Sequence, residues 1–393
     1  MRHFVSAWTI LLLALHVQAQ IIGIQNEQDL HASSFTTTDT SDVGSLADRG
    51  LITESPTSTD ILENHAITSH DTARNFNQLV LGYVTPWHSK GYDIAKKFRG
   101  KFTYISPVWY YIKPKNSNSF KSYKLEGGHD VDEGWMKEVR APLPDRRRVK
   151  IVPRFQIPGL SQEAFLALVS DESIMKKIIR LIADECEKHS FDGIVLEVFL
   201  PNYLKRFIQL LSSTLHTSQR DLILVISPWK DVTTTADPFS PRDFEEMVEY
   251  VDAFSIMTYD YSVQASIGGP NAPIEELHKA VERLGKVSPG NRNKILMGMN
   301  CYGYRFAVWP EGQLEAIVGT TYLEILSKFS PKIKWDSTYG EHSFQYTHGK
   351  QVYEVWYPTL QSIDDRLTLA KEMHSGISLW EIGQGLDYFY DLL

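Results

Sequence analysis

The chain has 393 residues, of which 42% are hydrophobic and 22% are charged, and its formal net charge is −8 at pH 7. This composition supports a packed core and excludes global disorder. The acidic balance argues against nucleic acid or an anionic membrane as the main partner. Two cysteines, Cys186 and Cys301, are too few for a disulfide-rich scaffold or a cysteine-based zinc module.

Residues 1–19 have the pattern of a secretory signal peptide. Arg2 and His3 give a basic start, an apolar run covers residues 8–15, and a cleavage pattern ends at Ala19. The apolar run is well short of the ~20 residues that a membrane span requires. We therefore expect a secreted, extracellular protein without a transmembrane segment.

Residues 20–75 are rich in Ser, Thr, Asp and Asn, and their apolar residues show no period. Such a segment buries too little apolar surface to offset the entropy lost on ordering, so we expect a flexible polar extension. From about Leu46 onward, its apolar residues would allow it to lie against the domain that follows.

From residue 76 to the C-terminus, eight short apolar runs alternate with segments of helical period. The runs are 79–85, 102–109, 149–155, 193–198, 222–227, 253–257, 295–300 and 377–380. They are nearly continuous in apolar residues, which is typical of parallel strands covered on both faces. The eight strand–helix repeats predict an α/β protein of the (β/α)₈ TIM-barrel type over residues 76–393. A doubly wound sheet is the alternative, but no Gly-x-Gly-x-x-Gly follows an early strand.

The interval between the seventh and eighth runs is longer than the others. It contains a helical pattern around residues 322–328, followed by strand-like segments at 333–336, 343–346 and 352–357. We therefore expect a small α+β insertion over residues 303–357. It would lie on the barrel rim, where the walls of active sites are usually built.

Aromatic and acidic residues collect at the carboxyl ends of the predicted strands, where such a barrel carries its functional side chains. They are Trp87, Trp109, Glu197 to Phe199, Trp229, Tyr259-Asp260-Tyr261, Tyr302 and Trp380-Glu381. Core packing would explain any one of these aromatics but not the preference of the set for one end. Pyranose rings stack on flat aromatic faces, and their hydroxyls need polar partners, so the set indicates a saccharide site.

Four strings near the strand ends are distinctive: Phe191-Asp192-Gly193-Ile194, Met257-Thr258-Tyr259-Asp260-Tyr261, Met299-Asn300-Cys301-Tyr302-Gly303-Tyr304 and Ser378-Leu379-Trp380-Glu381. Together they resemble the glycoside hydrolase family 18 chitinases, and the resemblance runs from about residue 79 to the end. It implies that Trp380 lies under the central sugar of the ligand. It also implies that Tyr259 and Asp260 hydrogen-bond the acetamido group.

The fourth strand departs from the family pattern. Active members carry Asp-Gly-x-Asp-x-Asp-x-Glu there, and the final Glu is the general acid that protonates the leaving oxygen. Asp192 matches the first Asp, Val195 and Glu197 replace the next two, and Phe199 stands at the acid position. Glu197 lies about 6.6 Å earlier along the strand. It is therefore better placed to hold an acetamido nitrogen than to act as the acid.

We therefore expect a chitinase-like lectin that binds chitooligosaccharides or related N-acetylated glycans without efficient hydrolysis, and we expect no catalytic residue. Trp87, Trp109 and Tyr302 would extend the groove, and Glu381 completes the expected binding set. No cofactor and no metal are expected, because the 13 histidines show no metal-ligand spacing and no phosphate-binding loop is present.

Two other functional classes stay open. One is a weak chitinase or peptidoglycan N-acetylglucosaminidase with a displaced carboxylate, for which Glu381 and Asp260 are the candidates. The other is a protein-interaction module whose barrel rim binds a sorting receptor. The resemblance further implies a sorting receptor of the stabilin type, delivery to the lysosome and a role in innate immunity.

Overall fold

The computed structural model describes residues 44–69, 73–116, 119–228, 237, 239–263, 268–309 and 314–393. The expected signal peptide (1–19), the first part of the expected polar extension and Trp229 lie outside the described residues. Within the described ranges, no helix combines the length and apolar character needed to cross a membrane.

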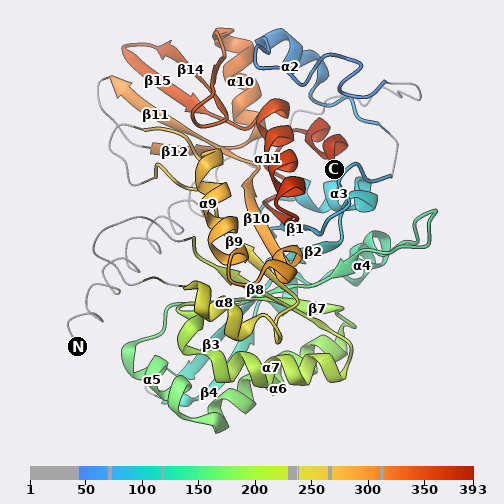
Figure 1. Ribbon diagram of the computed structural model, residues 1–393, viewed down its shortest axis with the longest axis vertical. Helices are drawn as coiled ribbons and strands as arrows, with labels where there is room; N and C mark the ends of the chain where they lie inside the picture. Colours follow the sequence, from blue (N-terminus) through green and yellow to red (C-terminus); the bar gives the residue numbers. More distant parts are fainter. Residues whose placement is uncertain are drawn as a thin grey trace.

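An eleven-stranded sheet forms the body of the molecule (Figure 1), with the hydrogen-bonded order β4-β3-β6-β7-β8-β9-β10-β16-β1-β2-β5. Its strands are β1 (Val80–Val84), β2 (Tyr104–Pro107), β3 (Tyr110–Asn116), β4 (Ser119–Glu126), β5 (Lys150–Ile151), β6 (Arg154–Ile157), β7 (Gly193–Val198), β8 (Asp221–Ile226), β9 (Ala253–Ile256), β10 (Ile295–Asn300) and β16 (Gly376–Trp380). All neighbours pair in parallel except the β3–β4 hairpin. Each of the eight predicted runs forms a strand of this sheet.

The sheet closes into a barrel through two strands that are each divided into two segments, β2 with β3 and β5 with β6. Strand β2 pairs with β5, while β3 pairs with β6, both in parallel. Only Val152 and Pro153 separate β5 from β6, so the two ends of the sheet meet. The predicted (β/α)₈ barrel is confirmed. The β3–β4 hairpin, which extends beyond the predicted second strand, was not predicted.

Helices surround the barrel (Figure 1). The α-helices are α2 (Ser58–Asn64), α3 (Lys90–Lys97), α4 (Glu133–Val139), α5 (Gln162–Ser170), α6 (Glu172–Lys188), α7 (Lys205–Thr217), α8 (Pro241–Met247), α9 (Ile274–Gly285), α10 (Gly319–Phe329) and α11 (Leu360–Glu372), and the 3₁₀ helices are η2 (Arg99–Lys101), η3 (Gly128–Asp130), η4 (Pro201–Tyr203), η5 (Pro289–Lys294) and η6 (Asp387–Leu392). Helix α8 begins at a capping box that Ser240 and Asp243 form, with Pro241 at the first helical position.

A second, antiparallel sheet lies between β10 and β16 in the chain and appears at the top of Figure 1. Its order is β12-β11-β15-β14-β13, with strands β11 (Gly303–Trp309), β12 (Leu314–Ile317), β13 (Lys334–Asp336), β14 (Glu341–His348) and β15 (Gln351–Trp356). Helix α10 packs on it through Tyr322, whose ring centroid lies 6.0 Å from that of Phe344. The chain therefore contains the α+β insertion that the sequence predicts between the seventh and eighth barrel strands.

The polar extension has structure from residue 44 onward. Leu46 and Ile61 are buried in the main core, and α2 lies beside α10 (Figure 1). The hydroxyl of Ser58 donates to the carbonyl of Pro331 at 3.2 Å. The expectation of a flexible segment therefore does not hold for residues 44–69, whereas the expected contact from about Leu46 is present.

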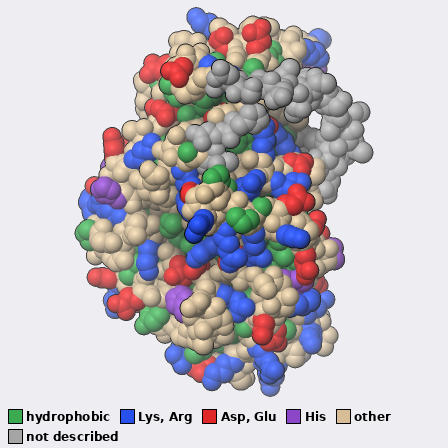
Figure 2. Space-filling model, turned by 90° about the vertical axis from the view of Figure 1, so that its right-hand side faces the viewer, with side chains coloured by type: hydrophobic (Ala, Val, Ile, Leu, Met, Phe, Trp, Pro, Cys, Tyr) green, Lys and Arg blue, Asp and Glu red, His purple; other side chains and the backbone are tan. Residues whose placement is uncertain are grey.

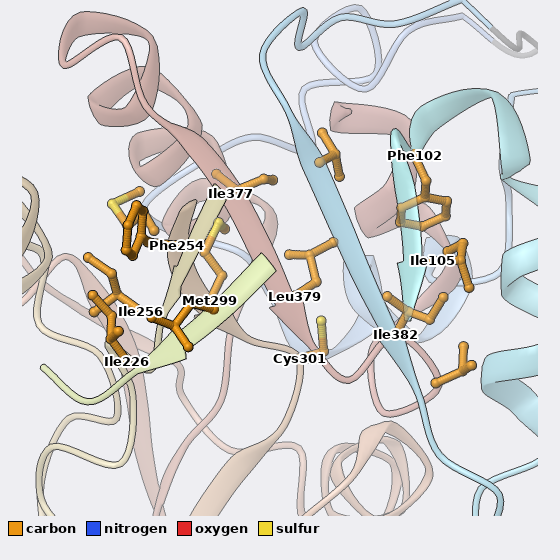
Figure 3. Close-up of a cluster of buried hydrophobic side chains, with 14 of the residues drawn as sticks. Phe102, Ile105, Ile226, Phe254, Ile256, Met299, Cys301, Ile377, Leu379 and Ile382 are labelled. Atoms are coloured by element: carbon orange, nitrogen blue, oxygen red, sulfur yellow. The ribbon is translucent and has the colours of Figure 1, made fainter. Parts of the chain in front are cut away.

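The apolar side chains form two layers separated by the barrel wall. Figure 3 shows part of the outer layer, between strands and helices, with Phe254, Met299 and Ile377. The inner layer fills the barrel and includes Val152 and Val195. Because successive strand residues point to opposite faces, this division fixes which side chains reach the carboxyl end of the barrel interior.

Charge is unevenly distributed over the surface. On the face shown in Figure 2, Lys and Arg side chains gather near the middle, and acidic side chains lie around them. The net charge of −8 is therefore a total over areas of both signs.

Candidate functional site

A carboxylate is held at the carboxyl end of the barrel by two neighbouring side chains. Glu197 is the direct partner of Gln156 in the parallel pairing of β6 and β7. Gln156 Nε2 donates to Glu197 Oε1 at 2.7 Å, and Arg154 Nη1 donates to Oε2 at 2.9 Å. Both carboxylate oxygens thus accept hydrogen bonds, which is the arrangement of an anion.

Strand alternation explains why these three side chains meet. Val152 and Val195 belong to the inner apolar layer. Arg154 and Gln156 lie two and four residues after Val152, and Glu197 lies two residues after Val195, so they share the inward face. The side chains of Arg154 and Glu197 are 5% and 17% exposed, so the ion pair is largely desolvated.

Aromatic rings flank the ion pair. The guanidinium carbon of Arg154 lies 5.6 Å from the ring centroid of Tyr111 and 6.0 Å from that of Trp380. Trp380 is half-buried, and its ring centroid lies 5.2 Å from that of Tyr83 at an interplanar angle of 57°. The Tyr83 hydroxyl donates to Ser255 Oγ at 3.0 Å inside the barrel. Trp380 therefore packs against the Tyr83 ring, which this hydrogen bond holds in place, while part of the Trp380 surface stays accessible.

Asp260 forms the second carboxylate centre. It follows β9 in a left-handed conformation (φ 61°), and its backbone N–H donates to Asn271 Oδ1 at 2.8 Å. Its Oδ1 accepts the hydroxyls of Tyr302 and Tyr304, the latter at 2.6 Å. Burial and the nearby Asp260 charge raise the pKa of both phenols well above the usual value. Both phenols therefore stay protonated as donors.

Tyr259 connects the two centres. It is half-buried, its ring centroid lies 6.3 Å from that of Tyr302, and burial raises the pKa of its phenol. Tyr259 and Trp380 both pack against an aromatic cluster of the insertion that contains Tyr304 and Trp356. The structure therefore brings Trp380, Tyr259, Asp260, Tyr302 and Glu197 together at one end of the barrel.

Trp87 also belongs to this end of the barrel. It is half-buried and packs against the inner apolar layer. Its indole Nε1 is buried and has no hydrogen-bond partner among the described residues.

Two expected site residues lie elsewhere. Trp109 is 1% exposed in the outer layer, and its Nε1 donates to the Tyr92 hydroxyl at 2.8 Å. Its neighbour Val108 belongs to the inner layer, so alternation turns Trp109 outward. Glu381 is 0% exposed, lies 2.7 Å from His88 Nδ1 and accepts the backbone N–H of Gly383 at 2.8 Å. The expectation that Trp109 and Glu381 line the site is therefore wrong.

Phe199 follows the last residue of β7. It lines a small apolar pocket together with Ile157, Phe165 and Leu168, between the ends of β6 and β7 and helix α5. The next residue, Leu200, has a left-handed backbone (φ 51°). The position of the family's acid thus carries an apolar side chain in apolar surroundings.

Asp192, which matches the first Asp of the family motif, lies at the opposite end of β7. It accepts hydrogen bonds from Arg140 at 2.8 Å, from Arg148 at 2.9 Å and from the backbone N–H of Ile151 at 2.9 Å. These contacts anchor the amino end of the strand and place Asp192 far from the other site residues along β7.

Arg154, Gln156 and Tyr304 were missed by the sequence analysis. Arg154 and Gln156 carried a usable signal, because they are polar residues in phase with inward-facing Val152 at the end of an apolar run. In the described part of the chain, no group of three or more His, Cys, Asp or Glu side chains is placed to hold a metal ion.

The carboxyl end of a parallel barrel thus carries aromatic rings in tilted and edge-to-face contact and two carboxylates held by hydrogen bonds. Residues 79–385 match the family model of glycosyl hydrolases family 18. This match covers well over half of the chain, and the chain belongs to that family.

Individual proteins show the same relationship. The cortical fragment-lytic enzyme of Bacillus subtilis (strain 168) is 25% identical over 246 residues, which are 59% of this chain and 56% of that protein. The chain thus spans little more than half of that relative. A chitinase from Chromobacterium violaceum ATCC 12472 has a TM-score of 0.67 and 18% identity, covering 80% of this chain and 98% of that one.

A chitinase from Cycas revoluta in complex with (GlcNAc)₃ has a TM-score of 0.63 and 16% identity, covering 80% of this chain and 97% of that one. At these identities, the two structural matches establish a shared fold.

Proposed function

We propose that this protein binds N-acetylglucosamine-containing oligosaccharides, such as chitin oligomers or related bacterial glycans, without hydrolysing them efficiently. The observation that carries the proposal is Phe199 at the acid position, beside a Glu197 whose two oxygens already accept hydrogen bonds. The held carboxylate supports a role in binding, and the phenylalanine at the acid position has no proton to donate.

The binding half of the proposal rests on Trp380 and Glu197. The part-exposed Trp380 ring offers an apolar face on which a sugar can stack. Each carboxylate oxygen has two acceptor sites, so Glu197 retains capacity for a ligand N–H beside Arg154 and Gln156. An acetamido group fits this pairing of an aromatic face with a nearby acceptor.

The second half of the proposal, the lack of efficient hydrolysis, rests on the missing acid. Phenylalanine has no proton to donate, and Glu197 lies about 6.6 Å earlier along the strand. Loss of a positioned general acid lowers the rate by about 10²–10⁴-fold.

Calorimetric titration with chitotetraose tests the binding. We expect saturable binding by the wild type and its loss, by tenfold or more, in Trp380→Ala. Trp109→Phe is the matched control, because Trp109 lies in the outer core and should leave the affinity unchanged. Absence of binding at millimolar chitotetraose would reject the proposal.

A second candidate function is a slow peptidoglycan N-acetylglucosaminidase or chitinase. It is favoured by the similarity to a protein named as a cortical fragment-lytic enzyme. Because Glu381 is buried, Glu197 and Asp260 are the candidate acids at this end of the barrel in the described part of the chain. Release of reducing sugar from cortical peptidoglycan, abolished in Glu197→Gln or Asp260→Asn, would support this candidate.

We further propose that the protein is secreted, that it reaches the lysosome through a stabilin-type receptor, and that it senses microbial saccharides in innate immunity. The support is the leader pattern of residues 1–19 and four strings that resemble chitinase domain-containing protein 1: 81–87, 105–109, 268–273 and 383–388. Expression of the full chain in secretory cells tests the first step. Recovery from the medium of a chain cleaved after Ala19 supports it, and retention of the uncleaved chain in the cytosol contradicts it.

A further inference from the structure

We propose that Arg154 determines the specificity of this site by selecting uncharged, N-acylated sugars over cationic, N-deacetylated ones. The inference rests on the proposed function, because it concerns the same saccharide site. Arg154 is outside the family's catalytic motif, and no motif in the sequence assigns it a role.

The first step is the charge balance of the ion pair. Arg154 Nη1 donates to Glu197 Oε2 at 2.9 Å, and the arginine side chain is 5% exposed. Its Nε is buried and has no hydrogen-bond partner in the described part of the chain. Since little water reaches this guanidinium, its positive charge acts on nearby groups with little screening. The charge of Glu197 is therefore largely compensated.

The second step is the position of the pair relative to the stacking surface. The guanidinium carbon lies 6.0 Å from the ring centroid of Trp380. A sugar stacked on this ring therefore presents its substituents close to both Arg154 and Glu197. Asp260 is the other nearby carboxylate, and Tyr302 and Tyr304 already donate to it.

The third step compares two nitrogen substituents. An acetamido N–H is neutral, so it can donate to Glu197 without repulsion from Arg154. An ammonium group gains attraction from Glu197 but is repelled by Arg154, and it loses hydration on entering the site. The intact ion pair therefore favours the amide. A Glu197 without its arginine would favour the cation.

The test measures two dissociation constants by calorimetry at mildly acidic pH, one for chitotetraose and one for the tetramer of glucosamine. We expect the wild type to prefer chitotetraose. Arg154→Gln should shift the ratio of the two constants about tenfold or more towards the glucosamine tetramer. Arg154→Lys keeps the charge and should retain the wild-type preference. At alkaline pH, where the amines are neutral, the effect of Arg154→Gln on the ratio should disappear.

A second variant covers the case in which Arg154→Gln does not fold. Gln156→Glu removes a donor to Glu197 and adds a negative charge beside it, so the ratio should move in the same direction. Gln156→Leu removes this donor, and the amide oxygen that accepts from Arg154 Nη2 at 3.4 Å, without adding a charge, and it should keep the wild-type preference. A purely structural role would weaken both ligands equally, so an unchanged ratio in Arg154→Gln and Gln156→Glu would overturn the inference. A wild type that binds neither tetramer would overturn the proposed function as well.

Discussion

Gln156 and Glu197 are direct partners in the parallel pairing of β6 and β7, and the amide of Gln156 donates to the carboxylate of Glu197 at 2.7 Å. With Arg154 on the other oxygen, this contact fixes Glu197 as an acceptor two residues before Phe199. Glu197 is therefore a fixed hydrogen-bond acceptor near the carboxyl end of β7. The position at which the family pattern places the acid is occupied by Phe199.

Trp109→Phe should affect stability and leave sugar affinity unchanged. The substitution removes the hydrogen bond from Nε1 to the Tyr92 hydroxyl and part of a buried ring. We expect a loss of about 1–3 kcal/mol in the free energy of unfolding, measured with urea. A change in chitotetraose affinity without a change in stability would place Trp109 in the site after all.

Asp260→Ala should destabilise the chain, because it leaves the buried hydroxyls of Tyr302 and Tyr304 without their acceptor. We expect a loss of about 2–4 kcal/mol in the free energy of unfolding. A double-mutant cycle with Tyr304→Phe should give a coupling energy of about 0.5–3 kcal/mol. Strictly additive effects would show that the Tyr304–Asp260 contact does not contribute.

His342 should make the protein less stable in acid. Its Nε2 lies 3.1 Å from the Glu54 carbonyl and its Nδ1 lies 2.8 Å from Thr359 Oγ1. Burial lowers its pKa to about 4, and the hydrogen bond to the Glu54 carbonyl opposes this shift. In the unfolded chain the pKa is about 6.5, so between these values the unfolded state binds more protons. Stability should therefore fall as the pH drops from about 6.5 to 4, by up to about 3 kcal/mol in total.

The measurement for His342 is the free energy of unfolding at several pH values, for the wild type and for His342→Gln. The variant has no imidazole to protonate, so its stability should depend less on pH over this interval. Parallel curves for the two proteins would contradict the assignment.

The two cysteines should be unreactive in the native protein. Both are buried, and neither forms a disulfide. Burial raises the pKa of the Cys186 thiol to about 12 and also raises the pKa of the Cys301 thiol. The thiolate is the reactive form, so Ellman's reagent should label no thiol in buffer at pH 8 and two per chain in denaturant. Labelling of the folded chain, or fewer than two thiols after unfolding, would disagree with the structure.

The barrel was predictable because its strands are covered on both faces and read as continuous apolar runs. The β3–β4 hairpin was not, since Lys113, Lys115 and Asn116 interrupt the apolar pattern in the outer part of β3, where the strand pairs with β4. Strands β11 and β12 were also not among the strands predicted for the insertion.

The site was predictable only in part. Trp380, Tyr259 and Asp260 were identified through the family resemblance, which assigns roles to the sequence strings that contain them. Trp109 and Glu381 were misplaced because a shift of one residue at a strand end turns a side chain to the opposite face. The face to which a side chain at a strand end points depends on where the strand bends, and the amino-acid composition does not show this.

The most direct test of the account is to incubate the purified protein with chitotetraose under conditions in which calorimetry shows binding, and to follow the products by mass spectrometry. We predict that the tetramer stays intact on the timescale of ordinary turnover, about 1–10³ per second for typical enzymes. Chitobiose accumulating at such rates from the wild type, and not from Glu197→Gln, would contradict the account.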